Sequence, residues 1–459
     1  MNTLSQDTVE ILYLAAAVCF ILALKGLSSP RSARRGNLIG AAGALLALGT
    51  TFLSTDLDSI VPILLAIALG SAIAVPAARR VQMTQMPQLV ALFNGVGGGA
   101  AALVAILELS ENSSQSAGDL AATSFTVLVG AVSFAGSAVT FAKLQELMTT
   151  RPVVLPGAAP ALVVGMAVCL GLSVVVTLTG NLWMGGVLLA GGLLLGVMFV
   201  LPVGGADVPI VISLLNAFTG LTVAASGFVL RNTLLLVAGT LVGASGTILT
   251  RLMAAAMGRS VLGVLFGALR GGSTAGSTAV SNRPVKSVGP DDVAILLNYA
   301  RKVVVVPGYG LAVAQAQHTL RELAEVLQGR GIEVLYGIHP VAGRMPGHMN
   351  VLLAEANVPY TALKEMDEVN PEFKTTDVVL VVGANDVVNP AAKTSPGAPI
   401  YGMPILEVSQ AQQVIFLKRS MRPGFAGIEN ELLFEPTTSL LFGDAKDSLT
   451  KVLGAVKAL

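Results

Sequence analysis

The stretch Arg301-Lys302-Val303-Val304-Val305-Val306-Pro307-Gly308-Tyr309-Gly310-Leu311-Ala312-Val313 decides the fold of the second half of this chain. Its four consecutive valines indicate a strand that is buried on both faces, as strands in parallel sheets are. A Gly-x-Gly turn follows at once, and apolar residues at helical spacing then predict an amphipathic helix that ends near Gly329 and Gly331. A second apolar run at 332–338 completes a strand–helix–strand unit, so we expect an α/β domain with a parallel sheet.

The glycine turn predicts a dinucleotide-binding, Rossmann-like domain, and each of its positions has an expected role. Gly308 supplies the tight turn, and Gly310 lets the backbone approach a pyrophosphate at the start of the helix. Val313 stands where a third glycine is usual, which predicts slightly wider packing of helix on strand. His339-Pro340 follows the second strand, where an NAD site has a carboxylate for the ribose 2′-hydroxyl. The missing carboxylate favours a nucleotide with a 2′-phosphate.

Two further apolar runs end in loops with suitable polar residues. The run 414–417 ends at Lys418-Arg419-Ser420, whose two charges and hydroxyl suit a phosphate dianion. A solvated basic strand end is the alternative interpretation. The run 378–382 leads into Gly383-Ala384-Asn385-Asp386, and ligands bind at the carboxyl ends of parallel strands. Asp386 is therefore placed to meet a ribose hydroxyl or an amide, and the Gly-rich stretch 421–427 is predicted to fold over the ligand as a lid.

The first half of the chain has the composition of a membrane protein. Of the 459 residues 53% are hydrophobic and 12% are charged, whereas about 25% are charged in ordinary soluble proteins. Residues 1–260 hold 11 Lys/Arg and 9 Asp/Glu, while the shorter remainder holds 17 and 18. The net charge of +1 offers no field that would attract nucleic acid. The three histidines lack the spacing of a metal site, and the two cysteines lie in apolar runs.

Apolar runs of about 20 residues, the length of a membrane-spanning helix, recur along this half. We place nine of them, near 9–27, 36–54, 58–76, 87–108, 120–142, 160–179, 182–201, 206–228 and 231–257. Lys and Arg cluster in the 25–36, 79–86 and 143–158 loops, and the positive-inside rule puts those loops in the cytoplasm. The N-terminus is then expected outside and the residues after 258 inside, although Arg231 lies in a loop expected outside. The first run is expected to be a retained helix.

The whole pattern predicts three parts. Residues 1–260 are expected to form the transmembrane domain, 261–290 a Gly/Ser/Thr-rich linker or hinge, and 291–459 the nucleotide-binding domain. Polar residues at membrane depth are costly, so those in or near the spans indicate a bundle interior or a water-filled path. They are Asn94, Ser137, Asp207, Asn216 and Ser245. Hydrogen bonding between the helices that carry Asn216 and Asn94 is the alternative.

Four stretches of the sequence together resemble one family. They are PGYGLAVAQAQ at 307–317, GIHPVAGRMPGHMNV at 337–351, GAND at 383–386 and KRSM at 418–421. The chain is similar over essentially its whole length to the beta subunit of the proton-translocating NAD(P)⁺ transhydrogenase. The resemblance implies an NADP(H) site on this chain, an NAD(H) site on a separate alpha subunit, and direct hydride transfer from NADH to NADP⁺ driven by protons that enter the cell.

The resemblance also implies which residues line the nucleotide. They are Gly308, Tyr309, Gly310, Ala312, Val313, His339, Ala342, Gly343, Arg344, Gly383, Ala384, Asn385, Asp386, Lys418, Arg419, Ser420, Gly424, Phe425, Ala426 and Gly427. Within this set Lys418, Arg419 and Ser420 would hold the 2′-phosphate, and Gly424–Gly427 would be the lid. In the membrane the resemblance implies a proton path, with Arg259 at the hinge. The implied path residues are Asn94, Ser137, Asp207, Asn216, Ser245 and Gly246.

The expected assembly contains alpha subunits with further membrane helices, associates as a dimer of the whole complex, and lies in the bacterial inner membrane. One residue departs from the family, because some members have a histidine in the fourth span where this chain has Asn94. Asparagine does not titrate near neutral pH, so the proton carrier would be Asp207, water or a residue of a partner helix. We favour a histidine of a partner membrane helix.

Two other functions would use similar parts. A nucleotide-sensing gate on a channel or transporter also needs a membrane bundle and one nucleotide site. A dehydrogenase that reduces a quinone would need a second cofactor motif, which we do not find. Hydride transfer needs no side-chain acid or base, so we expect no catalytic residue of that kind. Protons would act by changing the affinity for NADP⁺ relative to NADPH.

Overall fold

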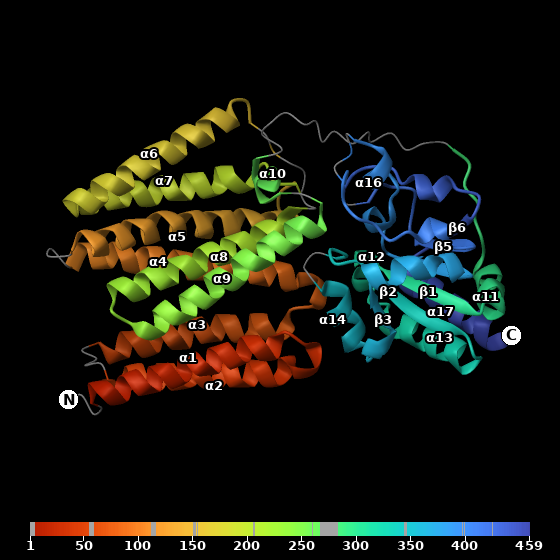
Figure 1. Cartoon of the computed structure of the whole chain (residues 1–459), viewed down its shortest axis with the longest axis horizontal. Helices are drawn as coiled ribbons and strands as arrows, with labels where there is room; N and C mark the ends of the chain where they lie inside the picture. Colours follow the sequence, from red (N-terminus) through yellow and green to blue (C-terminus); the bar gives the residue numbers. More distant parts are fainter. Residues whose placement is uncertain are drawn as a thin grey trace. The chain divides into compact units, whose positions relative to one another are not determined.

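The computed structural model describes residues 5–54, 59–111, 116–149, 153, 155–204, 207–258, 260–266, 283–343, 347–396, 398, 400–424 and 426–459. These residues fall into two compact units, Met1–Val203 with Val211–Thr250 and Gly204–Ile210 with Arg251–Leu459. Figure 1 shows the elements of each unit in chain order. Most of the predicted linker, residues 267–282, lies outside the described residues.

Nine helices in the described ranges are long and apolar enough to cross a membrane, as the sequence predicts. They are α1 Gln6–Leu27, α2 Pro30–Ser54, α3 Ile60–Arg80, α4 Met86–Glu111, α5 Ala117–Leu144, α6 Ala158–Thr179, α7 Leu182–Val200, α8 Val208–Val229 and α9 Thr233–Ala256. A short helix, α10 Val261–Phe266, follows them. The spans are therefore confirmed with shifts of a few residues at their ends, and the chain is a multi-pass membrane protein.

Glycines let these helices approach closely. A Cβ atom on Gly130 of α5 would lie 2.7 Å from the carbonyl oxygen of Gly98 in α4, and one on Gly196 of α7 would lie 2.4 Å from that of Val132 in α5. Apolar side chains gain nothing by meeting in lipid, so close backbone contact is what holds such helices together. Glycines of α4, α5 and α7 thus allow these three helices to pack backbone against backbone.

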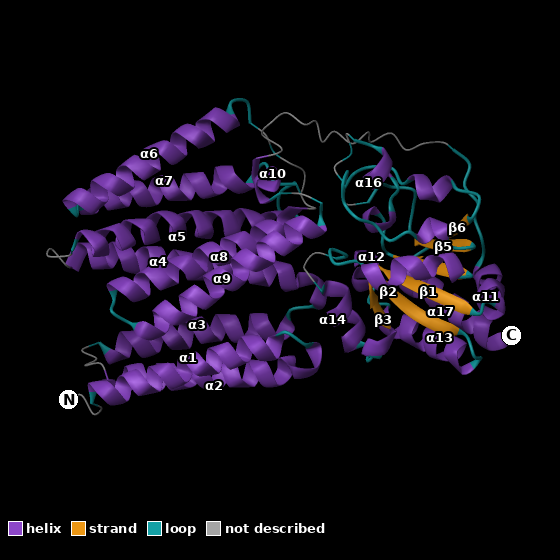
Figure 2. Cartoon of the chain, in the orientation of Figure 1, coloured by secondary structure: helices purple, strands orange, loops and turns teal. Residues whose placement is uncertain are grey.

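The second unit contains a six-stranded parallel sheet with strand order β3-β2-β1-β4-β5-β6. The strands are β1 Lys302–Pro307, β2 Glu333–Ile338, β3 Leu363–Glu365, β4 Val378–Val382, β5 Gln413–Lys418 and β6 Thr438–Phe442. The helices are α11 Pro290–Tyr299, α12 Tyr309–Val313, α13 Gln317–Gly329, α14 His348–Glu355, α15 Met366–Val369, α16 Ala391–Thr394 and α17 Ala445–Ala458. Figure 2 shows the strands of this sheet among their covering helices. This is the Rossmann-like architecture that the sequence predicts.

The structure differs from the sequence-based expectation in three places. It adds β3 and β6, which are short or rich in Thr and Ser. It also places a helix, α12, within the predicted glycine turn, and α13 begins only after Gln315, which has a φ of +49°. Val313 is 43% exposed, so its side chain does not lie between helix and strand, and the predicted wider packing of helix on strand stays a prediction.

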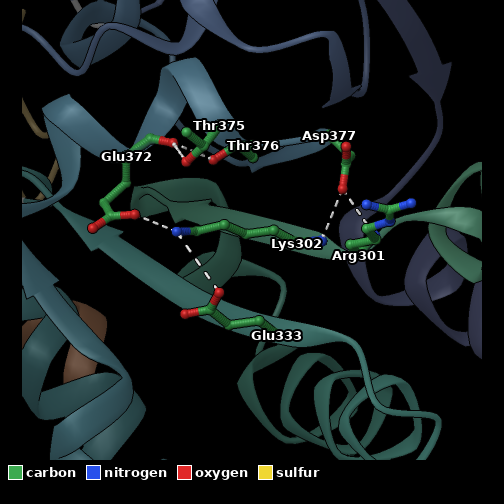
Figure 3. A network of polar contacts seen from close by, with 7 residues as sticks. All are labelled: Arg301, Lys302, Glu333, Glu372, Thr375, Thr376 and Asp377. Carbon is green, nitrogen blue, oxygen red and sulfur yellow. Dashed lines mark hydrogen bonds and ion pairs between the residues drawn. The ribbon is translucent and has the colours of Figure 1, made fainter.

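The amino ends of the central strands are held by a polar network (Figure 3). Lys302 Nζ forms ion pairs with Glu372 and Glu333. Asp377 Oδ2 accepts hydrogen bonds from the backbone N–H groups of Arg301 (2.8 Å) and Lys302 (3.0 Å). These contacts join the first residues of β1 to β2 and to the turn before β4.

Candidate functional site

All sequence-predicted nucleotide-binding loops follow the carboxyl ends of strands in one parallel sheet. The loops begin at Gly308 after β1, His339 after β2, Gly383 after β4 and Arg419 after β5. Because the strands are parallel, these loops share one edge of the sheet. The strand order reverses between β1 and β4, and dinucleotides bind at such a switch point. The four loops are therefore brought together as the sequence predicts.

The β1 and β4 loops contact each other through their glycines. Gly308 N–H donates to Val382 O and Gly310 N–H to Gly383 O, each at 2.9 Å. A Cβ on Gly308 would lie 2.4 Å from the Ala384 nitrogen, and one on Gly310 would lie 2.7 Å from the Gly383 Cα. Gly383 itself has a φ of +69°. Glycine is thus required at these positions for loop-to-loop contact, whether or not a pyrophosphate approaches.

The remaining residues of the β1 loop belong to α12. Leu311 and Ala312 are buried under the sheet edge, whereas Tyr309 is partly exposed. The Tyr309 ring lies edge-on to the buried His348 ring, with 6.1 Å between ring centroids. Tyr309 therefore joins the β1 loop to the start of α14, a contact that no motif predicts.

His339 is a buried connector between two loops. Its Nδ1 accepts a hydrogen bond from Val341 N–H (3.2 Å), and its Nε2 lies 2.8 Å from Pro404 O. Because Nδ1 accepts, the proton sits on Nε2 and is donated to the Pro404 carbonyl. Burial lowers the pKa of His339 to about 4, although the bond to Pro404 acts in the opposite direction. His339 is thus neutral at physiological pH and fixes the β2 loop against the loop near Pro404.

The rest of the β2 loop packs on helix α14. Ala342 is buried, and its N–H donates to His339 O at 3.0 Å. Gly343 has a φ of +105°, and a Cβ there would lie 2.7 Å from the His348 ring. Arg344, which the resemblance assigns to the nucleotide, lies outside the described residues.

The predicted lid is tied to the β4 loop. Asp386 Oδ2 accepts a hydrogen bond from Ala426 N–H (2.9 Å), and Asn385 Nδ2 donates to Asp386 Oδ1 (3.1 Å). A Cβ on Gly424 would lie 2.5 Å from both Asn385 Nδ2 and Asp386 Oδ1. Gly427 has a φ of +73° and closes a turn with Gly424 O. Phe425 lies outside the described residues.

Two buried asparagines also hold this segment, and sequence reasoning missed them. Asn430 Nδ2 donates to Asn385 O (3.1 Å), and Asn430 Oδ1 accepts from Leu432 N–H (3.0 Å). Asn389 Nδ2 donates to Glu429 O (3.0 Å), and its Oδ1 accepts from Ala391 N–H (3.0 Å). Both side chains are almost fully buried. In the sequence these two asparagines differ from others only in lying close to the predicted site loops, and many asparagines lie close to loops. We call residues 419–430 the strap.

The three predicted phosphate-binding residues have different surroundings. Lys418 is partly buried, and its Nζ donates to Asn385 Oδ1 (3.3 Å) and Arg422 O (3.1 Å). Burial lowers the pKa of Lys418, and the nearby Asp386 carboxylate partly offsets this. Arg419 and Ser420 are exposed at the end of β5. The ammonium of Lys418 therefore joins the strap to the β4 loop, and the charge of Arg419 faces solvent.

In the membrane helices the structure joins Asn94 to Ser137. Asn94 Nδ2 donates to Ser137 Oγ (2.9 Å) and to Ser133 Oγ (3.3 Å). Ser133 Oγ donates to Leu215 O (3.0 Å) and lies 2.7 Å from Thr219 Oγ1. This buried cluster links α4, α5 and α8. Ser133 lies one helical turn from Ser137, a spacing that could have identified it.

The other predicted path residues are not part of this cluster. Within the described residues, the hydrogen bonds seen for Asn94 go to Ser133 and Ser137 and not to Asn216. The helices that carry Asn94 and Asn216 are therefore joined through Ser133, which bonds to Leu215 and Thr219 of α8. Ser245 is exposed, and its Oγ donates to Val242 O of its own helix. Gly246 O accepts from Ser213 Oγ at 3.2 Å. Asp207 is 8% exposed at the start of α8. Arg259, the predicted hinge residue, lies outside the described residues.

Lys143 is a buried cation that sequence analysis treats as a loop charge. Its Nζ donates to the carbonyl oxygens of Val200 (3.1 Å), Leu201 (2.6 Å) and Val203 (2.7 Å). The last carbonyls of a helix have no partner within it, and cations are favoured there. Lys143 of α5 therefore caps the carboxyl end of α7.

The described spans and the parallel sheet with its switch point define a class, namely multi-pass membrane proteins with a nucleotide-binding domain. Comparison with known proteins then gives the family. Residues 9–455 match the family described as NAD(P) transhydrogenase beta subunit. Two relatives from Rhodospirillum rubrum, one of them from a particular strain, are named NAD(P) transhydrogenase subunit beta. Each is 48% identical over 454 residues, which cover 97% of this chain and 98% of the relative.

The chain belongs to the NAD(P) transhydrogenase beta subunit family, which confirms the resemblance found in the sequence. It is a subunit of an oxidoreductase whose family binds NADP(H) and couples hydride transfer to proton translocation. A beta subunit implies an alpha-subunit partner.

Proposed function

We propose that this chain binds NADP(H) at the carboxyl edge of its sheet, across β1 and β4, and exchanges hydride there with NAD(H) held by an alpha subunit. The observation that carries this proposal is the end of β5. Lys418, Arg419 and Ser420 are adjacent there, and His339 rather than a carboxylate follows β2. NADP(H) differs from NAD(H) by a 2′-phosphate, which two cations and a hydroxyl suit.

Each loop is proposed to contact a different part of the nucleotide site. The β1 loop, Gly308–Val313, and the β2 loop, His339–Arg344, would line it, with Gly383–Asp386 on the β4 side. The strap, with Gly424–Gly427, would cover it. When bound, the nucleotide supplies the hydride chemistry, and this chain orients the ring and excludes water. Because Asp386 and Lys418 hold the strap, their contacts would control how readily nucleotide exchanges.

The membrane path would run through the Asn94 cluster. Asn94 Oδ1 is buried and has no hydrogen-bond partner among the described residues, which suits a bound water. We keep Ser137, Asp207, Asn216, Ser245 and Gly246 as path residues and Arg259 as the hinge. Asparagine does not titrate near neutral pH, so we assign the proton to a histidine of a partner membrane helix, with Asp207 as competitor.

Coupling would act through binding, because proton occupancy and nucleotide affinity are reciprocally linked. A potential of about 100 mV supplies roughly 2.3 kcal/mol per proton moved across the membrane. That free energy corresponds to a change in affinity ratio of about 50-fold. Such a change is useful but modest, because a complete switch between two states needs a ratio of about 10⁴.

The proposed assembly contains this chain and alpha subunits that carry the NAD(H) site and further membrane helices, paired into a dimer and surrounded by lipid. We place it in a bacterial inner membrane with the N-terminus outside and the nucleotide domain in the cytoplasm. Arg231, the one basic residue in a loop assigned outside, forms an ion pair with Asp119 at 3.1 Å. This single basic residue is outnumbered by the Lys and Arg residues of the three loops assigned inside, which set the orientation.

The test uses the purified complex of alpha and beta subunits. We expect NADH to reduce NADP⁺ in the complex and not with this chain alone. Arg419→Ala should weaken NADPH binding about 10-fold or more, because a hydrogen bond to a charged group contributes about 1.5–3 kcal/mol. Lys446→Ala, which removes an exposed lysine of α17, is the control and should bind NADPH as wild type does.

Two results would contradict the proposal. One is equal affinity of the wild-type chain for NADPH and NADH, since the 2′-phosphate would then contribute nothing. The other is ion flux through the complex without hydride transfer, which would support the nucleotide-sensing gate.

A further inference from the structure

The last part of the predicted linker is bound to the edge of the parallel sheet. Ser287 pairs in parallel with Leu440 of β6, the strand at one edge of the sheet. Leu440 N–H donates to Lys286 O (2.8 Å), and Val288 N–H donates to Leu440 O (3.0 Å). Val285 and Val288 pack against the hydrophobic core of the domain. An edge strand has unpaired backbone groups, and this segment satisfies two of them. The segment is therefore part of the nucleotide domain.

Arg283 begins this segment and reaches the short 3₁₀ helix that follows the strap, η8 Glu431–Phe434. Its Nη1 lies 2.7 Å from Glu431 Oε2. The central carbon of its guanidinium lies 4.0 Å from the centre of the Phe434 ring. A carboxylate and the face of an aromatic ring both attract a cation, so Arg283 is held at both ends of η8.

The helix η8 is fixed in turn to the strap and to the β4 loop. Asn430, the last residue of the strap, accepts from Leu432 N–H of η8 at its Oδ1 (3.0 Å). The Nδ2 of the same side chain donates to Asn385 O (3.1 Å). The next residue, Asp386, accepts from Ala426 N–H within the strap (2.9 Å). Direct contacts therefore lead from the end of the linker through η8 to the strap and the β4 loop.

The exposure of the Arg283–Glu431 pair limits what it contributes to folding. The two side chains are 49% and 53% exposed, close to the 50% and 53% of the pair Lys457–Glu322. An exposed ion pair changes an equilibrium by about fivefold at most. The two pairs differ in what they join, because Lys457 connects α17 to α13, whereas Arg283 connects the linker to the base of the strap. This difference makes Lys457 a matched control.

We propose that Arg283 is a positioning residue for NADP(H) exchange, because it fastens the carboxyl end of the strap to the segment that connects the membrane helices to α11. The strap opens less readily while Arg283 contacts Glu431 and Phe434. A displacement of the linker that separates these groups frees η8 and makes the strap easier to open. This inference rests on the proposed function and names the residue that carries linker movement to the strap.

The first test is amide hydrogen exchange in the whole complex without nucleotide. Arg283→Met and Glu431→Gln should each accelerate exchange in peptides that cover 419–430, by about threefold to tenfold for Arg283→Met, which loses both contacts. The double variant should exchange as Arg283→Met alone does, because both changes remove the same contact. Arg283→Lys, which keeps the charge, should recover part of the protection. Lys457→Met should exchange as wild type does.

The second test measures the rate of NADPH release from the complex in lipid vesicles, with and without a proton gradient. Arg283→Met should release NADPH about threefold to tenfold faster than wild type without the gradient. The gradient should then change its release rate less than half as much as it changes that of wild type. Lys457→Met should keep both wild-type values. A contact that only stabilises the fold would leave the response to the gradient unchanged.

Three results would overturn the inference. They are wild-type exchange of the strap peptides in Arg283→Met and Glu431→Gln, effects of these two changes that add up in the double variant, and an unchanged response of Arg283→Met to the gradient. If wild type itself releases NADPH at the same rate with and without the gradient, the coupling in the proposed function fails instead. The exchange measurements still test the contact of Arg283 with η8, so the two failures are distinguishable.

Discussion

The carboxylate of Asp386 and the backbone of Ala426 are joined by a hydrogen bond of 2.9 Å, although 40 residues separate them in sequence. Asp386 follows β4 and Ala426 lies in the strap after β5, so this bond fastens the strap to the neighbouring strand end. The second carboxylate oxygen accepts from Asn385 Nδ2. Asp386 is thus positioned by its own loop to hold the strap, in addition to its proposed contact with a ribose hydroxyl or an amide.

Replacing Asp386 by Ala should loosen the strap. The lost hydrogen bond has a charged acceptor, and such bonds contribute about 1.5–3 kcal/mol. We expect amide hydrogen exchange in peptides that cover 419–430 to accelerate about 10-fold or more, since exchange follows the free energy of local opening. Asp367→Ala removes an exposed carboxylate in the first turn of α15 and should leave the strap unchanged. Equal exchange in wild type and Asp386→Ala would mean that the bond does not hold the strap.

Gly383→Ala should destabilise the nucleotide domain. The residue has a φ of +69°, and a Cβ would lie 2.3 Å from the Leu311 nitrogen. Backbone strain of this kind costs about 1–3 kcal/mol before the clash is counted. We expect the thermal midpoint of the full chain in detergent to fall by about 4–8 °C, the shift that about 2 kcal/mol gives in a domain of this size.

The control for this substitution is Gly329→Ala at the end of α13. No atom lies within 4 Å of a Cβ built there. Alanine favours a helix over glycine by up to about 1 kcal/mol, so the midpoint should stay the same or rise slightly. A normal midpoint for Gly383→Ala would show that the β1 and β4 loops can move apart without cost.

The sequence was sufficient to predict the spans and four of the six strands. Burial in lipid or in a parallel sheet requires a continuous run of apolar residues. Runs of about 20 apolar residues, and stretches such as Val303–Val306, can therefore be recognised in the sequence alone. Strand β3 has only three residues, Leu363–Glu365, and β6 begins with Thr and Ser, so neither stands out from a loop. Their place in the sheet depends on pairing with β2 and β5, which no local pattern encodes.

The predicted site loops are also brought together, but their contacts depend on the tertiary structure. A motif can indicate that Asp386 follows a strand, and it cannot indicate which backbone N–H will reach it from the next loop. The same limit applies to Asn94, whose bonds to Ser133 and Ser137 depend on how α4 and α5 are rotated against each other. Asn389 and Asn430 were missed because the role of a buried asparagine depends on its hydrogen-bond partners, which only the tertiary structure shows.

The free energy of unfolding should decrease as the pH is lowered through a window set by the pKa of His339. Burial lowers the pKa of this group from 6.5 to about 4 in the folded chain. Between these values the unfolded state binds more protons, so the free energy of unfolding decreases as the pH falls. The loss attributable to His339 should reach about 2 kcal/mol at pH 5. The measurement is the denaturant midpoint of the nucleotide domain within the full chain at pH 7 and at pH 5.

Two variants isolate this effect. His339→Gln should lower stability at pH 7 and reduce the difference between pH 7 and pH 5. His318→Gln, which changes an exposed histidine on α13, should retain the wild-type difference. The same pH dependence in His339→Gln and wild type would show that another group is responsible.

Replacing Lys143 by Met should destabilise the membrane bundle. The substitution keeps an unbranched side chain and removes an ammonium that donates to the carbonyl oxygens of Val200, Leu201 and Val203. Those oxygens lie at the last residue of α7 and in the turn just after it, and Lys143 is fully buried, so water does not readily replace its bonds. We expect a loss on the order of 3 kcal/mol, as is usual when one member of a buried charge-assisted set is removed.

The measurement is the thermal midpoint of the chain in detergent, followed by a probe in the α7–α8 loop. Lys25→Met provides the comparison, because Lys25 also lies in the last turn of a spanning helix and is exposed. It should unfold as wild type does, whereas Lys143→Arg should recover part of the stability through its own donors. If Lys143→Met and Lys25→Met unfold at the same temperature, the carbonyls of α7 are satisfied without Lys143, and the cap contributes nothing to the bundle.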